Sequence, residues 1–425
     1  MPHPPQELHV RSFDNGMTLL VQPMPGVKSA AFDLRLAAGA ATDPVERCGS
    51  ATVLAEMVLR GAGERNARQL TEAMDDLGIA RGGGAGVQSV RFSWAGLAEK
   101  ATAALPIHAD IVRRPTLTGD AFGPSRELAL QALAGLADNP QSLAMIKLRE
   151  WFWPSPYSRN AMGETKHLEK LTVDAVREDF SERWRAGGAM LSVAGDVELD
   201  QIAGEVEKHF GDWATGEAVP IETTAAPGAF RFIEQDSQQT HIAMACQAPA
   251  ESSDDYYVCR LAVEVLSGGM SGRLFDRIRE KQGLCYSVYA GYTAIGGPNL
   301  PVHAGAIQAY AGTSNDRAQA TLDALLRELT IIREGAAADE LERAKVGLKA
   351  GLVMAGESTS ARAASLAGDW LSHGRLRTLD EILAAMDAVT LDRLNDWLAG
   401  NPLENFTTVL IGPEKLEVKE MASAS

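Results

Sequence analysis

The chain has 425 residues, of which 45% are hydrophobic and 23% are charged, and its formal net charge is −16. A chain of this length and composition normally folds into two or three domains with large buried cores. The acidic balance argues against a nucleic-acid partner and against adhesion to anionic membranes, because both need a basic face on the protein.

The sequence carries no visible targeting or anchoring segment. The N-terminus has no basic region followed by an apolar core, and the chain has no run of roughly 18 apolar residues that could span a bilayer. The four cysteines are scattered without a C-x-x-C motif, which is typical of reduced, buried thiols. We therefore expect a cytoplasmic protein by default, with a periplasmic location as the alternative if a signal peptide has been removed.

Residues 49–61 form an apolar stretch flanked by Gly49 and Gly61, which predicts a short apolar helix that carries Glu56 as its one acidic side chain. A zinc site needs about three ligands from His, Cys or carboxylate side chains, usually with two of them at helical spacing. No two of the eight histidines are three or four residues apart. We therefore expect no metal in this chain.

The most glycine-dense segment, residues 81–88, is not expected to bind a nucleotide. A phosphate-binding loop follows a strand, precedes a helix and carries Lys followed by Ser or Thr. Here a predicted strand at residues 90–94 follows the glycines instead. The plain structural interpretation is a flexible or bulged turn between a helix and that strand.

The chain contains an internal duplication. A helix with Thr172 as its N-cap leads into a strand at residues 189–196, and a helix with Thr390 as its N-cap leads into a strand at residues 406–413. Both threonines are followed by an aspartate two residues later. A repeat with so long a period indicates duplicated domains and not a solenoid.

The starts of the two halves also correspond, since residues 30–39 match residues 241–248 in their strand pattern. The join lies in a segment rich in Pro, Gly, Thr and Ala that has no periodic apolar face. We predict an N-terminal domain at residues 1–214, a linker at residues 215–228 and a C-terminal domain at residues 229–425.

Within each half, alternating strands such as residues 90–94 accompany long helical stretches such as residues 318–332. Groups of strands followed by groups of helices favour the α+β class. We predict two homologous domains, each with one antiparallel-dominated sheet and helices packed on one face of that sheet.

The most informative segment is residues 279–286, which follows a glycine-rich turn at residues 267–272. Arg279 and Tyr286 span a predicted helix end and the strand after it, so both side chains can point at one small anion or carbonyl oxygen. Arg provides a permanent charge and Tyr a directional O–H donor, a pairing that suits a developing oxyanion. The alternative is a structural hydrogen-bonded pair at a helix end.

Residues 273–286 resemble the C-terminal half of the pitrilysin/insulinase-type zinc peptidases. This family includes the mitochondrial processing peptidases and the core proteins of the respiratory cytochrome complex. The resemblance extends over nearly the entire chain and implies two halves that close over a cavity. It also implies that Arg279 and Tyr286 hold the substrate and stabilise the tetrahedral intermediate.

The zinc site of that family is an inverted H-x-x-E-H helix followed by a distal Glu. On the resemblance, Thr52 and Glu56 replace the two histidine ligands of this helix, and Ala55 replaces the glutamate base. Ala132 stands where the distal ligand is expected. All four metal-site positions are therefore expected to be degenerate.

Two glycine-rich segments gain a substrate-binding role from the resemblance: Gly82, Gly83, Gly84 and Ala85, and Gly268 and Gly269. The first segment corresponds to a sheet edge that takes an extended peptide as an added strand, with the plain turn left open as the alternative. The second resembles the substrate-engaging loop of the non-catalytic processing-peptidase subunit, with a closely packed helix start as the alternative.

These observations predict the zinc-less subunit of a heterodimeric metallopeptidase that is inactive alone. Its partner would be a homologous H-x-x-E-H chain that holds the zinc, so no cofactor is expected in this chain, and the substrate would be a peptide. The alternatives are a non-catalytic scaffold or assembly protein, and a peptide-binding module on the same fold. Retention of Arg279 and Tyr286 favours the first interpretation, while a homodimer stays open.

Overall fold

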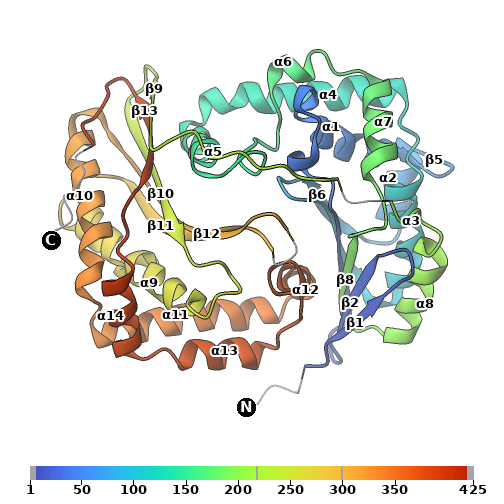
Figure 1. Cartoon of the computed structure of the whole chain (residues 1–425). Coiled ribbons are helices and arrows are strands. Elements are labelled where there is room, and N and C mark those ends of the chain that lie inside the picture. Colours follow the sequence, from blue (N-terminus) through green and yellow to red (C-terminus); the bar gives the residue numbers. More distant parts are fainter. Residues whose placement is uncertain (1–5, 217–218, 298–299, 419–425) are drawn as a thin grey trace. The chain divides into compact units, whose positions relative to one another are not determined.

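The computed structural model describes residues 6–216, 219–297 and 300–418 (Figure 1). Residues 217 and 218 of the expected linker lie outside the described residues. The chain divides into two compact units, each built from segments that are not contiguous in sequence. Unit 1 comprises Met1–Gly135, Ser155–Thr224 and Met354–Thr378, and unit 2 comprises Leu136–Pro154, Ala225–Val353 and Leu379–Ser425.

Unit 1 is built on a six-stranded sheet with the order β1-β2-β8-β3-β7-β6. Neighbouring strands are antiparallel except β2 and β8, which are parallel. The strands in this order are β1 (His9–Ser12), β2 (Thr18–Pro23), β8 (Met190–Gly195), β3 (Ser29–Leu36), β7 (Val90–Leu97) and β6 (Ala80–Ala85). A separate small ribbon pairs β4 (Gly61–Ala62) with β5 (Arg65–Asn66).

The two faces of the unit 1 sheet are covered differently. Large side chains such as Phe32 and Leu34 face a core formed with most of the helices of this unit. On the other face, Ala31 and Ala194 pack against Ala363 of α12, whose small side chains let the helix approach closely. The helices of unit 1 are α1 (Ser50–Met57), α2 (Ala67–Asp75), α3 (Ala101–Arg113), α4 (Gly119–Ala134), α6 (Thr165–Leu168), α7 (Val173–Arg183), α8 (Leu199–Phe210) and α12 (Thr359–His373).

Unit 2 is built on a five-stranded sheet with the order β11-β12-β10-β13-β9, antiparallel except for β13 and β9. Its strands in this order are β11 (Ser287–Gly296), β12 (His303–Ser314), β10 (Gln239–Ala248), β13 (Thr407–Gly412) and β9 (Phe230–Glu234). Its helices are α5 (Pro140–Phe152), α9 (Tyr256–Ser267), α10 (Ala318–Ile331), α11 (Ala338–Gly356, whose last residues fall in unit 1), α13 (Leu379–Asp387) and α14 (Leu391–Gly400).

The two sheets share one strand plan, which confirms the predicted α+β class with its antiparallel-dominated sheets. The order β2-β8-β3-β7-β6 corresponds to β9-β13-β10-β12-β11, and in each sheet the first two strands of this series are parallel. The predicted N-caps are also confirmed. The Thr172 hydroxyl accepts a hydrogen bond from the backbone N–H of Ala175 at the start of α7, and Thr390 accepts one from Arg393 at the start of α14.

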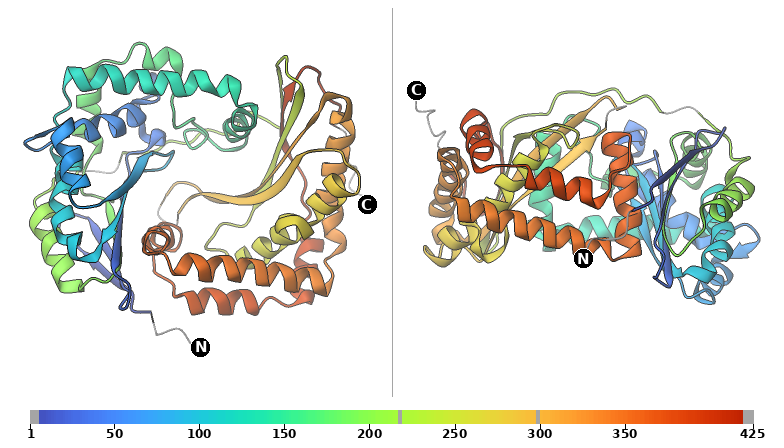
Figure 2. Two further views of the ribbon diagram at one scale, coloured as in Figure 1. Left: turned by 180° about the vertical axis from the view of Figure 1, so that it is seen from behind. Right: turned by 90° about the horizontal axis from the view of Figure 1, so that it is seen from below.

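One helix in each unit comes from the other half of the sequence (Figure 1, Figure 2). α12 lies in the C-terminal half but packs on the unit 1 sheet, where the Arg362 Nε donates to the Gln22 Oε1 at 2.8 Å. α5 lies in the N-terminal half but packs on β10 and β13 of unit 2, and the Arg231 guanidinium sits 5.3 Å from the centroid of the Trp151 ring. The sequence halves and the compact units are therefore different divisions of the chain.

The described part of the chain contains no helix that is both long and apolar enough to cross a membrane. All four cysteines are buried and unpaired, as their scattered positions predict. Burial raises the pKa of Cys246 and Cys259 to about 12, so these two thiols stay protonated and inert at neutral pH.

His108 on α3 is buried in unit 1 against the rings of Phe32 and Trp94, whose centroids lie 6.3 and 6.4 Å away. Burial lowers the pKa of His108 from 6.5 to about 4. Between these two values the unfolded state binds the proton that the folded state excludes. The folded state therefore loses stability as the pH falls through this range.

We expect the substitution His108→Asn to remove this pH dependence. Wild type should lose about 2 kcal/mol more stability than the variant between pH 7 and pH 5, whatever the cost of the substitution at pH 7. Equilibrium urea denaturation of both proteins at the two pH values measures the difference. An identical loss in both proteins would mean that His108 titrates as freely in the folded state as in the unfolded state.

Candidate functional site

Helix α1 carries the positions at which the family resemblance places the zinc motif, and a buried ion network fixes where this helix begins. Gly49 precedes α1 with φ of 105°, and the Asp43 carboxylate accepts hydrogen bonds from the backbone N–H groups of Gly49 (2.8 Å) and Ala51 (3.0 Å). The guanidinium of Arg183 lies 2.8 Å from Asp43 and 3.3 Å from Asp179. These three charged side chains are almost fully buried, so the network is a structural anchor.

The degenerate metal positions are occupied by side chains that are already engaged or cannot bind metal. The Thr52 Oγ1 donates to the carbonyl oxygen of Ala161 at 2.6 Å. The Glu56 carboxylate pairs with Arg60 of the next turn at 2.8 Å, and Ala55 is a buried methyl group. Ala132 is exposed on α4. One paired carboxylate does not meet the three-ligand requirement of zinc, so these residues do not fit the family's metal.

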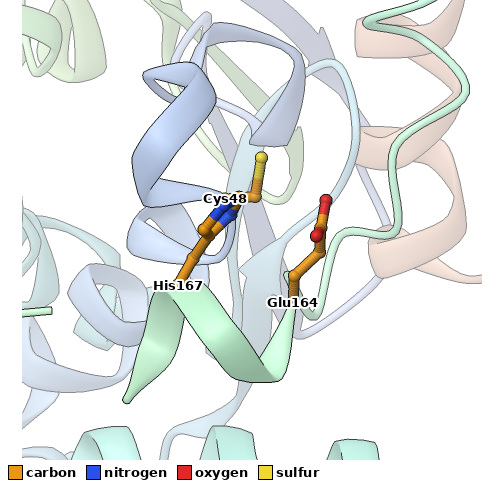
Figure 3. Close-up of side chains that lie close together, drawn as sticks. All are labelled: Cys48, Glu164 and His167. Atoms are coloured by element: carbon orange, nitrogen blue, oxygen red, sulfur yellow. The ribbon is translucent and has the colours of Figure 1, made fainter. Parts of the chain in front are cut away.

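A second group of potential ligands lies directly before α1 and was not found from the sequence. Cys48, Glu164 and His167 each offer a ligand atom, and these atoms all lie within 4.8 Å of one another. We call this group the Cys48 site (Figure 3). Glu164 caps the short helix α6 and His167 lies on it, whereas Cys48 comes from a distant part of the sequence. Only the spacing of three residues between Glu164 and His167 could have signalled part of it.

The glycine-rich segment 80–85 is the edge strand β6, not a turn between a helix and a strand. Among the described residues it pairs only with β7, and its residues Ala80 to Gly83 are exposed. Gly83 has φ of 143°, and a Cβ there would lie 2.1 Å from the carbonyl oxygen of Arg91, so no larger residue fits this pairing. Gly82, Gly84 and Ala85 lie on the same strand, which leaves one row of backbone groups without a strand partner.

Gly268 joins α9 to the short helix η6 (Gly269–Ser271), and Gly269 is the first residue of η6. Gly268 ends α9 by donating its N–H to the carbonyl of Glu264 at 2.6 Å, and a Cβ there would lie 2.5 Å from that oxygen. Gly269 has φ of 79° and open space around it. The neighbouring Met270 is 78% exposed. The segment thus joins the end of α9 to the start of η6 and presents an accessible apolar side chain, so both the substrate-engaging loop and the closely packed helix start stay open.

The structure brings Arg279 and Tyr286 together within unit 2. Arg279 lies in the last turn of the π-helix η7 (Phe275–Glu280), and Tyr286 directly precedes β11. The Arg279 guanidinium carbon lies 4.6 Å from the centroid of the Phe275 ring and 4.8 Å from that of Tyr286, so it stacks between two aromatic rings. The contact is a ring stack, in place of the side-chain hydrogen bond that the structural alternative assumed.

The three arginines of this segment have different partners. Arg273 binds both carboxylate oxygens of Glu340, at 2.7 and 2.6 Å, and Arg277 lies 2.9 Å from Glu328. Within the described residues, the only carboxylate within 4 Å of Arg279 is that of Glu280, at 3.9 Å. Arg273 and Arg277 therefore anchor η7 to its surroundings, and Arg279 keeps its N–H donors available.

The loop before Tyr286 is fixed by side chains that donate to its backbone carbonyls. The Thr313 and Thr321 hydroxyls both donate to the carbonyl of Leu284, at 2.5 and 3.2 Å, and Arg317 donates to Gly283 at 2.5 Å. Tyr286 itself is 78% exposed, and its hydroxyl has no hydrogen-bond partner among the residues that the structure describes. A rigid backbone thus presents an accessible phenol beside an accessible guanidinium.

The chain thus has two like α+β units, a helix α1 without the zinc ligands that the resemblance places there, and an adjacent Arg279 and Tyr286. Residues 170–348 match the family described as Peptidase M16 inactive domain. This segment contains Arg279 and Tyr286 but not α1. This segment is therefore similar to the inactive domain of the M16 peptidases, as the motifs of the chain predict.

Known relatives agree with this family over nearly the whole chain. An uncharacterized zinc protease of Rickettsia felis is 27% identical over 415 residues, which cover 97% of this chain and 99% of that protein. The crystal structure of a peptidase M16 inactive domain from Pseudomonas fluorescens matches with a TM-score of 0.87 at 22% identity, covering 97% of this chain and all of that one. A protease from Helicobacter pylori matches with a TM-score of 0.84 at 17% identity, covering 96% and 99% of the two chains. The two solved structures support the fold.

Proposed function

We propose that the chain is the zinc-less subunit of a two-subunit metallopeptidase and that it supplies Arg279 and Tyr286 to the zinc site of a homologous partner. The partner's H-x-x-E-H helix would hold the zinc and its activated water. Arg279 and Tyr286 would donate hydrogen bonds to the scissile carbonyl oxygen as it gains negative charge. This chain alone would then be inactive.

The observation that carries the proposal is the set of contacts that the Arg279 guanidinium makes. A structural arginine is normally neutralised by a carboxylate, as Arg273 and Arg277 are a few residues away. Arg279 instead is held in place by two aromatic rings that leave the edge of its guanidinium able to donate. Such an arrangement orients a cation without satisfying its donors, which is the property that an oxyanion-binding group needs.

The edge strand β6 supports peptide binding as part of the same function. Its unpaired backbone groups and its glycines allow the backbone of an extended peptide to add as a further strand. This observation also favours a second candidate function, a peptide-binding module with no part in hydrolysis. The degenerate helix α1 by itself is compatible with both functions.

Reconstitution separates the two candidates. We expect the purified chain to cleave no peptide, and a mixture with a cognate H-x-x-E-H chain to cleave peptides at a rate that neither chain reaches alone, while running as a heterodimer in size-exclusion chromatography. A matched control uses the partner with its motif glutamate changed to glutamine, which should assemble but stay inactive. Equal activity of the partner with and without this chain would reject the proposed function in favour of peptide binding or scaffolding.

A further inference from the structure

The Cys48 site combines three different donor types at one point of unit 1. Its ligand atoms are the Cys48 thiol sulfur, a Glu164 carboxylate oxygen and a His167 ring nitrogen. Cys48 is buried, His167 is half-buried and Glu164 is exposed, so the group has a closed side and an open side. None of these residues belongs to the degenerate metal positions on α1.

We propose that the Cys48 site binds one divalent transition-metal ion of the zinc class. Sulfur, imidazole and carboxylate together are a donor set that Zn²⁺ accepts, whereas Mg²⁺ and Ca²⁺ take oxygen ligands. Three protein donors leave the fourth tetrahedral position to water on the exposed side. The proposal departs from the sequence expectation of no metal, which considered histidine spacing and not a cysteine brought in from elsewhere in the fold.

The separations of the donor atoms are close to those that such an ion needs. Zinc bonds of about 2.0–2.3 Å in a tetrahedron place neighbouring ligand atoms about 3–4 Å apart. The observed group, within 4.8 Å, therefore has to contract by at most about 2 Å. Glu164 is exposed and can make this movement by changing its rotamer, without movement of the backbone.

The imidazole of His167 has a nitrogen that is ready to act as a ligand. Its Nδ1 is buried from solvent and has no hydrogen-bond partner among the described residues. A polar atom buried without a partner is costly, because its interaction with water is lost and nothing replaces it. Coordination of a metal ion through this nitrogen would give it the partner that it lacks.

The backbone around the Cys48 site is held in a fixed arrangement before any ion binds. The backbone N–H of Glu164 donates to the carbonyl of Cys48 at 3.2 Å, which joins the two segments directly. Gly163 and Gly49 pack against each other, and a Cβ on Gly163 would lie only 2.4 Å from the Gly49 Cα. The Thr52 hydroxyl ties α1 to Ala161 of the same loop. Preorganisation of this kind reduces the entropy that binding has to overcome.

The charges of the site suit a dication. The Cys48 thiol donates weakly to the Val45 carbonyl at 3.4 Å. Binding would transfer the thiol proton to solvent as the sulfur–metal bond forms, and thiolate plus carboxylate would then balance the two positive charges. To bind the metal, the Glu164 carboxylate would give up its exposed ion pair with the Lys166 ammonium, which lies 2.8 Å away. That exposed pair is worth little, so losing it costs little.

The test is zinc binding by the intact chain after treatment with a chelator. We expect isothermal titration with ZnCl₂ to give one ion per chain and MgCl₂ to give no binding. Co²⁺ should produce a thiolate charge-transfer band in the near ultraviolet, which only a sulfur ligand gives. Cys48→Ser should abolish this band and weaken zinc binding by at least about 100-fold, since loss of an outer-shell partner alone costs about 10–100-fold.

Two further variants and one control define the ligand set. Glu164→Gln and His167→Asn should each weaken zinc binding, with unchanged thermal unfolding of the metal-free chain. The matched control is His209→Asn on α8, because His209 also has a carboxylate neighbour, Glu205, at 3.2 Å, but no cysteine. Binding that is absent from wild type, or that survives Cys48→Ser, or that is lost in the control, overturns the proposal. Each measurement uses this chain alone, so the outcome does not depend on the proposed peptidase function.

Discussion

The variant Tyr286→Phe is expected to lower kcat of the reconstituted complex by a factor on the order of 10²–10³, roughly 3–4 kcal/mol, with little change in KM. The substitution removes one hydroxyl from an exposed ring and leaves the stack on Arg279 in place. A donor that acts on the oxyanion strengthens its bond only in the transition state, so its loss appears in kcat. Steady-state kinetics on a peptide substrate measures both constants.

Tyr289→Phe is the matched control for this prediction. Tyr289 lies on β11 of the same unit, and its hydroxyl accepts a hydrogen bond from Gln141 at 3.4 Å. We expect this variant to stay within about twofold of wild type. Arg279→Lys should give an intermediate defect, because Lys keeps the charge but loses the fork of donors and the flat stacking surface. If Tyr286→Phe behaves like Tyr289→Phe while the complex still assembles, the pair is structural.

The second large effect concerns the buried ion network at the start of α1. Replacement of Arg183 by Met should destabilise unit 1 by about 3–5 kcal/mol, because it leaves the buried carboxylates of Asp43 and Asp179 without their common cation. Asp43 also holds the first backbone N–H groups of α1, so the loss should reach the helix. Equilibrium denaturation measures the change in the free energy of unfolding.

The control for this prediction is Arg68→Met on α2. Arg68 forms an ion pair with Glu72 at 2.7 Å, with the same four-residue spacing as Arg183 and Asp179. Both side chains of the Arg68–Glu72 pair are exposed. Its loss should cost about 0.5 kcal/mol or less. A similar cost for Arg68→Met and Arg183→Met would show that the buried network contributes no more than a surface pair.

The features that the sequence predicted are those carried by local patterns. Thr172 and Thr390 are helix N-caps as expected, because a capping hydroxyl acts on the backbone two or three residues away. The strand at 90–94 and the helix at 318–332 follow from apolar periodicity. Proximity of Arg279 and Tyr286 was predictable because only a helix end and a short loop separate them.

The features that the sequence did not predict depend on contacts between distant segments. The glycines of β6 disfavour a strand on propensity, so only the family resemblance indicated a sheet edge here, and pairing with β7 overrides the local preference. Cys48 meets Glu164 and His167 only because two loops are packed together around Gly49 and Gly163. Local patterns also do not say on which sheet a helix packs, so the exchange of α5 and α12 between the halves could not be foreseen.

The packing of α12, from the C-terminal half, on the unit 1 sheet limits the order in which the chain can fold during synthesis. The ribosome has synthesised all strands of the unit 1 sheet once it reaches residue 195. The helix α12, which packs on Ala31 and Ala194 of this sheet, is complete only at residue 373. During the synthesis of everything in between, this face of the nascent sheet, which also carries the paired charges of Asp33 and Arg35, stays uncovered. An uncovered sheet face is a target for chaperones and for premature association with other chains. The small size of its alanine side chains keeps that exposed apolar area low until the covering helix emerges.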